Sequence, residues 1–263
     1  MGIVGFNAGL AQPSDFFLEI ARGNITGMSS IQKFGRNDDI SAGVTEDIWA
    51  GGGIRAYLTS AETMDVVSTS ANDDGAPAGT GAQTLTIEGL DSDYLEVSDT
   101  ITMNGVTAVT TTQSFLRVHR AYVVASGSNE TNVGDITIDP TTSGAGSRQA
   151  AIAAGDGQTL ISHYTVPAAK EAYWVGGQLS IGSRSGFAGI KEARARFWKR
   201  EENGSWRIQS DLGGRSDGTS VAPDVNFTVP VMFPTKTDLK WTGDAENNRT
   251  SMYVQYNLIL VNI

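Results

Sequence analysis

The two histidines are the residues of this sequence best suited to catalysis or metal binding, and their surroundings favour neither. His119 and His163 each lack a second metal ligand, or a serine and an acid, at a useful spacing. The sequence contains no cysteine, which excludes disulfides, cysteine-ligated zinc and a thiol nucleophile. Signature motifs of nucleotide-binding proteins and common hydrolases are absent as well. We therefore expect no enzyme activity, no cofactor and two ordinary histidines, exposed or partly buried.

Two short acidic clusters resemble fragments of a calcium-binding loop. Asp73 and Asp74 are adjacent, and Asp91 and Asp93 are separated by one residue. Neither cluster continues with both the glycine at the sixth position and the glutamate at the twelfth that complete an EF-hand loop. No two acids elsewhere are marked as a glycosidase pair. We interpret both clusters as solvated loop acids, with a bound cation as the alternative, and expect no metal site.

One basic cluster has aromatic residues between its charges, a combination that suggests nucleic-acid binding. Residues 194–200 read RARFWKR, and acidic residues flank them on both sides. The net charge of −10 argues against nucleic acid, because phosphate contacts need concentrated Lys and Arg. The alternation fits a strand with a charged outer face better. We predict that Arg194 and Arg196 contact the acidic loops of a neighbouring subunit.

The composition indicates an all-β protein. The 263 residues include 31 glycines, and long amphipathic helical patterns are hard to find. No apolar run approaches the roughly 18–20 residues that span a bilayer, and residues 1–12 lack the basic start of a secretory signal. We predict no membrane association and a β-sandwich or jelly-roll-like fold. We expect the chain to have three parts: an N-terminal arm over residues 1–55, a small β domain over 56–141 and a β-sandwich over 142–263.

Residues 1–55 differ from the rest because they lack a regular apolar period. A short helix, DFFLEIA, is predicted after Ser14, and a polar stretch punctuated by glycines follows it. We expect an extended, partly helical arm that docks on a neighbouring subunit or a larger assembly, with a disordered tail as the alternative. Large apolar side chains argue against disorder and are the predicted anchors on the partner: Phe16, Phe17, Phe34 and Trp49.

Short alternating runs predict the strands of both β domains. In the small domain we expect strands at residues 64–69, 83–87, 99–103, 106–110, 115–125 and 135–138. Asn104-Gly105 predicts a hairpin between two of them. In the larger domain, residues 158–181 predict two strands joined by a tight loop, and Asn203-Gly204 predicts another hairpin. The apolar run over residues 252–263 predicts a central, buried strand.

Several stretches resemble virion proteins of tailed bacteriophages, often marine ones. The resemblance is carried by ARGNITGMSSIQKFGRNDDI at residues 21–40, by WAGGG at 49–53, and by residues 66–97 together with MNG at 103–105. Residues 164–170, YTVPAAK, are similar to hairpins of jelly-roll capsid decoration proteins. The resemblance implies a structural protein at the particle surface, with other virion proteins as its partners. It places a protein in a virion without assigning a position there.

Three functions follow from these features. The first is a capsid decoration (cement) protein, forming a trimer, that stabilises the head through many weak contacts acting together. The second is a neck or tail adaptor, or a fibre-anchoring protein, that docks through the same arm. The third is a glycan-binding β-sandwich for attachment to host surfaces, with Trp174 and Trp198 as the aromatic faces that would stack on sugars.

Overall fold

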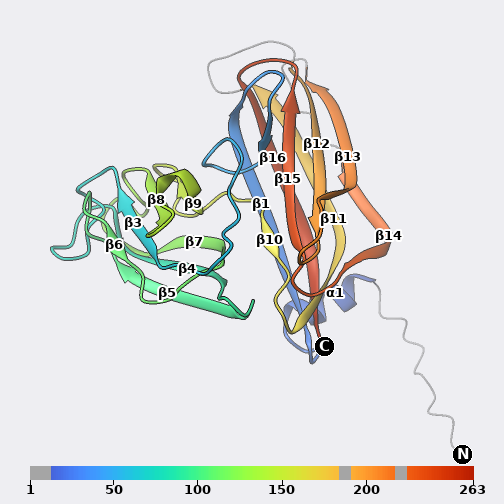
Figure 1. The fold of residues 1–263 in the computed structure, drawn as a ribbon, viewed down its shortest axis with the longest axis horizontal. Coiled ribbons are helices and arrows are strands. Elements are labelled where there is room, and N and C mark those ends of the chain that lie inside the picture. The colour runs from blue at the N-terminus through green and yellow to red at the C-terminus, as the bar shows by residue number, and fades with distance from the viewer. Residues whose placement is uncertain (1–12, 184–190, 217–223) are drawn as a thin grey trace, which may run out of the picture.

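The computed structural model describes residues 13–183, 191–216 and 224–263, with side chains from residue 16 onward. In this part of the chain, two β units stand side by side (Figure 1). The larger unit is a sandwich of two sheets, and the smaller one is inserted between the first and second main strands of the sandwich. The all-β prediction is confirmed. The start of the predicted arm, residues 1–12, lies outside the described residues.

The larger unit has the strand order of a jelly roll. Counted along the chain, its main strands are ordered 1-8-3-6 in one sheet and 2-7-4-5 in the other, and neighbours pair antiparallel. Sheet I consists of β1 (Met28–Ile40), β16 (Thr250–Asn262), β11 (Lys170–Ser183) and β14 (Asp224–Phe233). Sheet II consists of β10 (Tyr164–Thr165), β15 (Asp238–Ala245), β12 (Lys191–Arg200) and β13 (Arg207–Ser216), with the short β2 (Thr45–Asp47) paired to β15.

Aromatic side chains from both sheets meet in the centre of the jelly roll. The ring centroid of Trp174 on β11 lies 4.5 Å from that of Phe197 on β12. Phe197 also stacks on Trp241 at 5.0 Å and lies 5.2 Å from Tyr256. All four side chains are buried. Their large apolar surfaces make this cluster the main source of cohesion between the two sheets.

Most of the predicted arm belongs to this jelly roll. β1 pairs with β16 along nearly its whole length, and β2 pairs with β15. The expectation of an extended arm is therefore wrong for residues 28–47. The inward positions of β1 include Lys33, Gly35 and Asn37 in place of apolar side chains, which is why this strand shows no apolar period. A Cβ atom at Gly35 would collide with the backbone of Ile48 and Ser162, so glycine permits this close approach.

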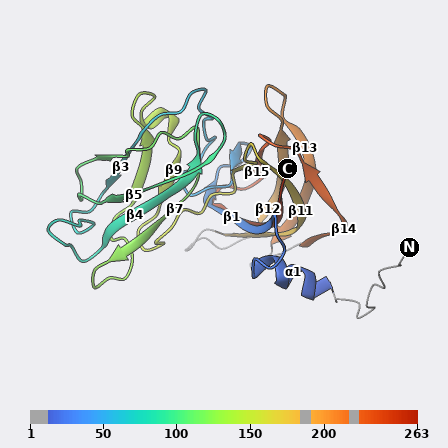
Figure 2. The same cartoon turned by 90° about the horizontal axis from the view of Figure 1, so that it is seen from below.

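α1 (Pro13–Ala21) precedes β1 and lies below β11 and β14 in the view of Figure 2. Its Ile20 is buried, and α1 contacts β1. α1 therefore packs against sheet I at β1.

The smaller unit, which we call the insert domain (residues 58–152), has its own core between two sheets. One sheet consists of β6 (Val109–Thr110), β3 (Met64–Ser68), β8 (Ile136–Pro140) and β9 (Ala150–Ile152), with a 3-10 turn, η1 (Ala145–Ser147), between the last two. The other consists of β5 (Glu96–Thr102), β4 (Ala82–Leu90) and β7 (Arg117–Ser126). Each strand predicted for the small domain has a counterpart here. Because β9 pairs with β8, the small domain extends past its predicted end at residue 141.

In two predicted hairpins the turn forms, but the strands on either side of it pair with other strands. Asn104-Gly105 forms a turn, but β5 before it pairs with β4, and β6 after it pairs with β3 in the opposite sheet. Residues 158–181 likewise divide between β10 in sheet II and β11 in sheet I. The hairpin at Asn203-Gly204 is confirmed, since β12 pairs with β13. The central position of the C-terminal strand is also confirmed, because β16 pairs with β1 and β11.

Candidate functional site

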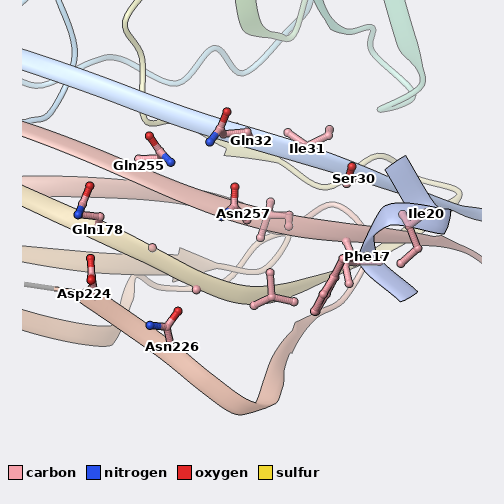
Figure 3. Close-up of a pocket in the computed structure, with 15 residues that line it drawn as sticks. Phe17, Ile20, Ser30, Ile31, Gln32, Gln178, Asp224, Asn226, Gln255 and Asn257 are labelled. Carbon is pink, nitrogen blue, oxygen red and sulfur yellow. The ribbon is translucent and has the colours of Figure 1, made fainter. Parts of the chain in front are cut away.

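A groove of about 590 Å³ crosses the outer face of sheet I (Figure 3). All four strands of the sheet line it, and α1 contributes Phe17 and Ile20 at one end. The volume falls within the range of about 300–1,000 Å³ that is typical of small-molecule sites. The groove is therefore large enough to hold a ligand.

Cross-strand register places polar side chains of the groove in two neighbouring rows. In the first row, Gln255 of β16 lies opposite Gln178 of β11, which in turn lies opposite Asp224 of β14. Directly opposed residues have Cβ atoms about 4.5–5.5 Å apart. These side chains consequently form a continuous polar line across three strands, which Figure 3 shows rising from the same face.

The second row lies two residues further along each strand. Asn257 of β16 lies opposite Gln32 of β1 on one side and Gly176 of β11 on the other, and Gly176 lies opposite Asn226 of β14. Because Gly176 has no side chain, the row has a gap between its amides. We call the polar side chains of both rows the groove polar set: Gln32, Gln178, Asp224, Asn226, Gln255 and Asn257.

A bulge and two glycines keep the floor of the groove low. On β11 the pairing with β16 skips Val175, which marks a β-bulge immediately before Gly176. A Cβ atom at Gly176 would lie 2.8 Å from the carbonyl oxygen of Val225. One at Gly177 would lie 2.6 Å from the carbonyl oxygen of Gln255. A side chain at Gly176 would therefore crowd β14 in the groove, and one at Gly177 would crowd Tyr256 of β16.

Most of the groove polar set has no partner within the described part of the chain. There, the side chains of Gln32, Gln178, Asp224, Asn226 and Asn257 make no hydrogen bond or ion pair, although they are exposed and lie close together. Gln255 is the exception, since its Oε1 accepts a hydrogen bond from the Tyr253 hydroxyl at 3.1 Å. The groove thus presents a set of free donors and acceptors.

A second polar cluster lies buried between the two units and is centred on Asp47. Its carboxylate, 0 % exposed, accepts hydrogen bonds from Lys240 Nζ at 2.8 Å and from the backbone N–H of Arg55 at 2.8 Å, and it lies 3.0 Å from His163 Nε2. Burial alone would raise the pKa of Asp47, but the contacts with His163 and Lys240 lower it to about 2. Burial lowers the pKa of His163 to about 4, so its imidazole is neutral at pH 7 and donates to Asp47.

Ion pairs extend this cluster across the boundary between the units. Arg117 of the insert domain donates from Nε to Asp238 of β15 at 2.9 Å, and Arg200 of β12 donates to the same carboxylate at 2.6 Å. The guanidinium carbons of Arg117 and Arg200 lie 4.9 and 4.5 Å from the ring centroid of Tyr57. These contacts join the insert domain to sheet II.

His119 and Lys33 form a further contact between the units. Lys33 Nζ on β1 donates to the carbonyl oxygen of His119 on β7 at 2.6 Å, and the backbone N–H of Thr165 donates to His119 Nε2 at 3.0 Å. Burial lowers the pKa of Lys33 to about 7 and the pKa of His119 well below its ordinary value. His119 is partly buried, as expected, whereas His163 is fully buried between the units, where an exposed or partly buried residue was predicted. His119 joins the insert domain to the jelly roll, whereas His163 bonds to Asp47 of β2.

The four residues predicted to anchor the chain on a partner lie in different environments. Phe16 and Phe17 lie on α1 with 43 % and 45 % of their surface exposed. Phe34 is partly buried on β1. Trp49 is buried, and its indole N–H donates to the carbonyl oxygen of Gly53 at 3.3 Å. The assignment of Trp49 to a partner surface is therefore wrong, because its side chain is part of the interior.

The remaining predicted contact residues are also placed by the structure. Arg194 and Arg196 both pair with Asp211 of the same chain, at 3.2 and 3.4 Å, so their contact with a neighbouring subunit stays a prediction. Trp174 is fully buried. Trp198 is partly buried and donates its indole N–H to Thr242 at 2.9 Å. Trp174 and Trp198 are not the exposed aromatic faces that were expected for glycan binding.

The acidic clusters have structural roles. Asp73 is buried, contrary to the expectation of a solvated acid, and accepts hydrogen bonds from the Ser68 hydroxyl and from backbone N–H groups of three residues. Asp91 accepts the backbone N–H groups of Asp93 and Leu95, which shapes a turn. Among the described residues, no group of three or more potential ligands could hold a metal ion. No helix in the same part of the chain is long and apolar enough to cross a membrane.

Sequence reasoning did not find the groove, although one signal was present. The polar faces of β11 and β16 follow from alternation, since Gln178 and Ser180 oppose the apolar face of one strand, and Tyr253, Gln255 and Asn257 that of the other. The sequence did not reveal which strands are neighbours, and the groove exists only because four distant segments pair in sheet I.

Comparison with known proteins adds little to this picture. No protein-family model matches the sequence, and no curated protein matches it significantly. The chain aligns with a structure of infectious bursal disease virus, Gt strain, at a TM-score of 0.23 and 11 % identity, covering 90 % of this chain and 77 % of that one. It aligns with the VP2 subviral particle of the same virus at a TM-score of 0.22 and 10 % identity, covering 94 % and 77 %. TM-scores this low do not establish a common fold.

Proposed function

We propose that this chain is a non-enzymatic structural protein of a virus particle, and specifically a capsid decoration protein. The observation that best supports the proposal is the jelly-roll strand order, an architecture of many viral capsid and lectin domains. Because one fold serves many functions, a second line of support matters. The resemblance of residues 21–40, 49–53 and 66–97 to phage virion proteins provides it.

The buried polar cluster also suits a structural role. Its charged groups pair with one another and are mostly buried, and the Arg117–Asp238 pair fixes the insert domain against the jelly roll. A decoration protein acts by holding its shape against the shell while many copies bind. This role requires the two units to keep a fixed arrangement, and it requires no catalytic residue.

The contact with the partner, another virion protein, is placed on α1 in this proposal. Phe16, Phe17 and Leu18 are consecutive, and each is 43–45 % exposed. A group of large exposed apolar side chains marks a protein-binding surface. Such residues become anchors when they enter a pocket of a partner. α1 thus takes over the docking role that the sequence assigned to the whole of residues 1–55.

A double substitution in α1 tests this contact. Phe16→Ala with Leu18→Ala removes apolar surface that the folded chain leaves exposed, so the thermal unfolding midpoint should stay close to that of the wild type. Occupancy on particles that lack the protein should fall by about tenfold or more if these are anchor residues. The matched control is Val124→Ala, which changes an even more exposed apolar residue of the insert domain and should bind fully. Full occupancy by the α1 variant would contradict the proposed contact.

Trimer formation is a further part of the proposal. β14 forms one edge of sheet I and β13 one edge of sheet II, and these strands carry exposed apolar side chains at Ile208, Val229 and Met232. Free edges with exposed apolar residues favour contact between chains. Light scattering on the isolated protein tests this point, and a monomer over the accessible concentration range would contradict it.

A further inference from the structure

We propose that the groove on the outer face of sheet I is a binding site for a neutral oligosaccharide. The proposal is independent of where the protein is located in a particle, because it is derived from the groove itself. The lining combines the groove polar set with a floor of two glycines and an apolar end wall from α1.

The polar groups match the chemistry of sugar hydroxyls. Each amide side chain offers an N–H₂ donor and a carbonyl acceptor, and each hydroxyl can likewise donate and accept. Two adjacent rows of such groups, all but Gln255 free of partners among the described residues, can bind several hydroxyls of one ligand at once.

The charge of the lining selects against other ligands. Among the described residues that line the groove, Asp224 is the only charged one, and none is Lys, Arg or His. A phosphate, a sulfated sugar or a nucleic acid would meet a carboxylate with no compensating cation. A ligand without charge avoids this repulsion and can still use the Asp224 carboxylate as a hydrogen-bond acceptor.

The apolar part of the lining is suited to the C–H faces of sugar rings. Val175 and Ile259 lie beside the two polar rows, and Phe17 stands at the end where α1 crosses the sheet (Figure 3). Sugars present polar edges and apolar faces, so they bind best where amides and apolar groups alternate over a short distance. This mixture distinguishes the groove from a purely polar surface.

An extended peptide is the main competing ligand, and the sheet disfavours it. Peptides that add to a sheet need an unpaired strand edge. β16 and β11, which form the centre of the groove, are paired on both sides, so their backbone groups are already satisfied. A ligand in the groove is therefore restricted to side-chain contacts, which favours a molecule with many hydroxyls.

The test uses the full chain and a panel of neutral oligosaccharides of glucose, galactose, mannose and N-acetylglucosamine. Sulfated and uronic-acid oligosaccharides and a pool of extended peptides serve as comparison probes. Binding is measured by saturation-transfer NMR and calorimetry. We expect at least one neutral oligosaccharide to bind, and to bind more tightly than its sulfated counterpart.

One groove variant and one control variant test whether the oligosaccharide binds in the groove. Gln178→Ala with Asn257→Ala removes one amide from each row and should weaken binding by about tenfold or more, while thermal unfolding stays unchanged because both side chains are exposed. Gln113→Ala, which removes an exposed amide on the insert domain, is the matched control and should bind like the wild type. The proposal is overturned if no neutral oligosaccharide binds at millimolar concentration, if the double variant binds like the wild type, or if anionic sugars or peptides are preferred.

Discussion

Asp47 shows how much of the stability of this protein depends on a few buried charges. It comes from β2, and it contacts Lys240 of β15 and His163 of the segment that leads from the insert domain into β10. A buried carboxylate is tolerated only with partners of this quality. At this scale, Asp47 holds β2 against β15 and the segment before β10, and the Arg117–Asp238 ion pair joins the insert domain to sheet II.

Replacing Asp47 with alanine should therefore be severely destabilising. The change leaves the Lys240 ammonium without its carboxylate in a buried site, and the expected loss is about 3–5 kcal/mol of unfolding free energy. Urea denaturation of both proteins at pH 7 measures it. The matched control is Asp211→Ala, which removes the partly exposed partner of Arg194 and Arg196 and should cost about 1 kcal/mol or less. Equal effects of the two substitutions would contradict the role assigned to the buried cluster.

β1 is the element whose place in the fold was hardest to foresee. It lies at one edge of sheet I and begins the jelly roll, although its sequence reads as a polar linker. Its partner β16 is more than two hundred residues away along the chain, and its inward side packs Lys33 against the insert domain. No local sequence pattern could predict pairing between strands so far apart along the chain.

Two truncated chains test whether β1 is an integral strand of the jelly roll or a dispensable arm. A chain that begins at residue 25 loses α1 but keeps all strands, so it should still unfold cooperatively. A chain that begins at residue 56 also loses β1 and β2, which exposes the apolar edge of β16, and it should fail to fold. Circular dichroism and thermal denaturation provide the readout. A stable, cooperative fold in the shorter chain would contradict the place given to β1.

The hairpin predictions show what local signals can and cannot provide. Asn203-Gly204 and Asn104-Gly105 both form turns, because the backbone conformation of a tight turn is a property of the residues in it. Only the first joins paired strands, since in the second case the flanking strands belong to opposite sheets. Strand positions and fold class were thus accessible from the sequence. Partner strands, and with them the groove, were not.

At the scale of the whole molecule, the boundary between the two units is a pH-sensitive surface. His163 faces Asp47, Lys240 and Arg55, and its pKa in the folded chain is about 4, compared with an ordinary value of 6.5. Between pH 6.5 and pH 4, His163 therefore binds a proton in the unfolded chain but not in the folded chain. Stability should fall as the pH decreases from about 6.5 towards 4. Asp47 adds a further loss in stronger acid, because its lowered pKa lies near 2.

Unfolding free energies at pH 7 and pH 5 test this expectation. The shift of His163 alone predicts a loss of about 2 kcal/mol at pH 5 relative to pH 7. His163→Gln keeps a hydrogen-bond donor for Asp47 but cannot take up a proton, so its stability should depend less on pH over this interval. The same loss in both proteins would show that His163 is not the group responsible.

The central claim is that this chain is a structural component of a virus particle, and quantitative mass spectrometry of purified particles tests it most directly. Copies are counted relative to the major capsid protein of the virus that encodes the chain. We predict a copy number in the hundreds, in a fixed ratio to the shell. A copy number of a dozen or fewer would contradict the decoration role and favour the neck or tail, and absence from the particles would contradict the structural role altogether.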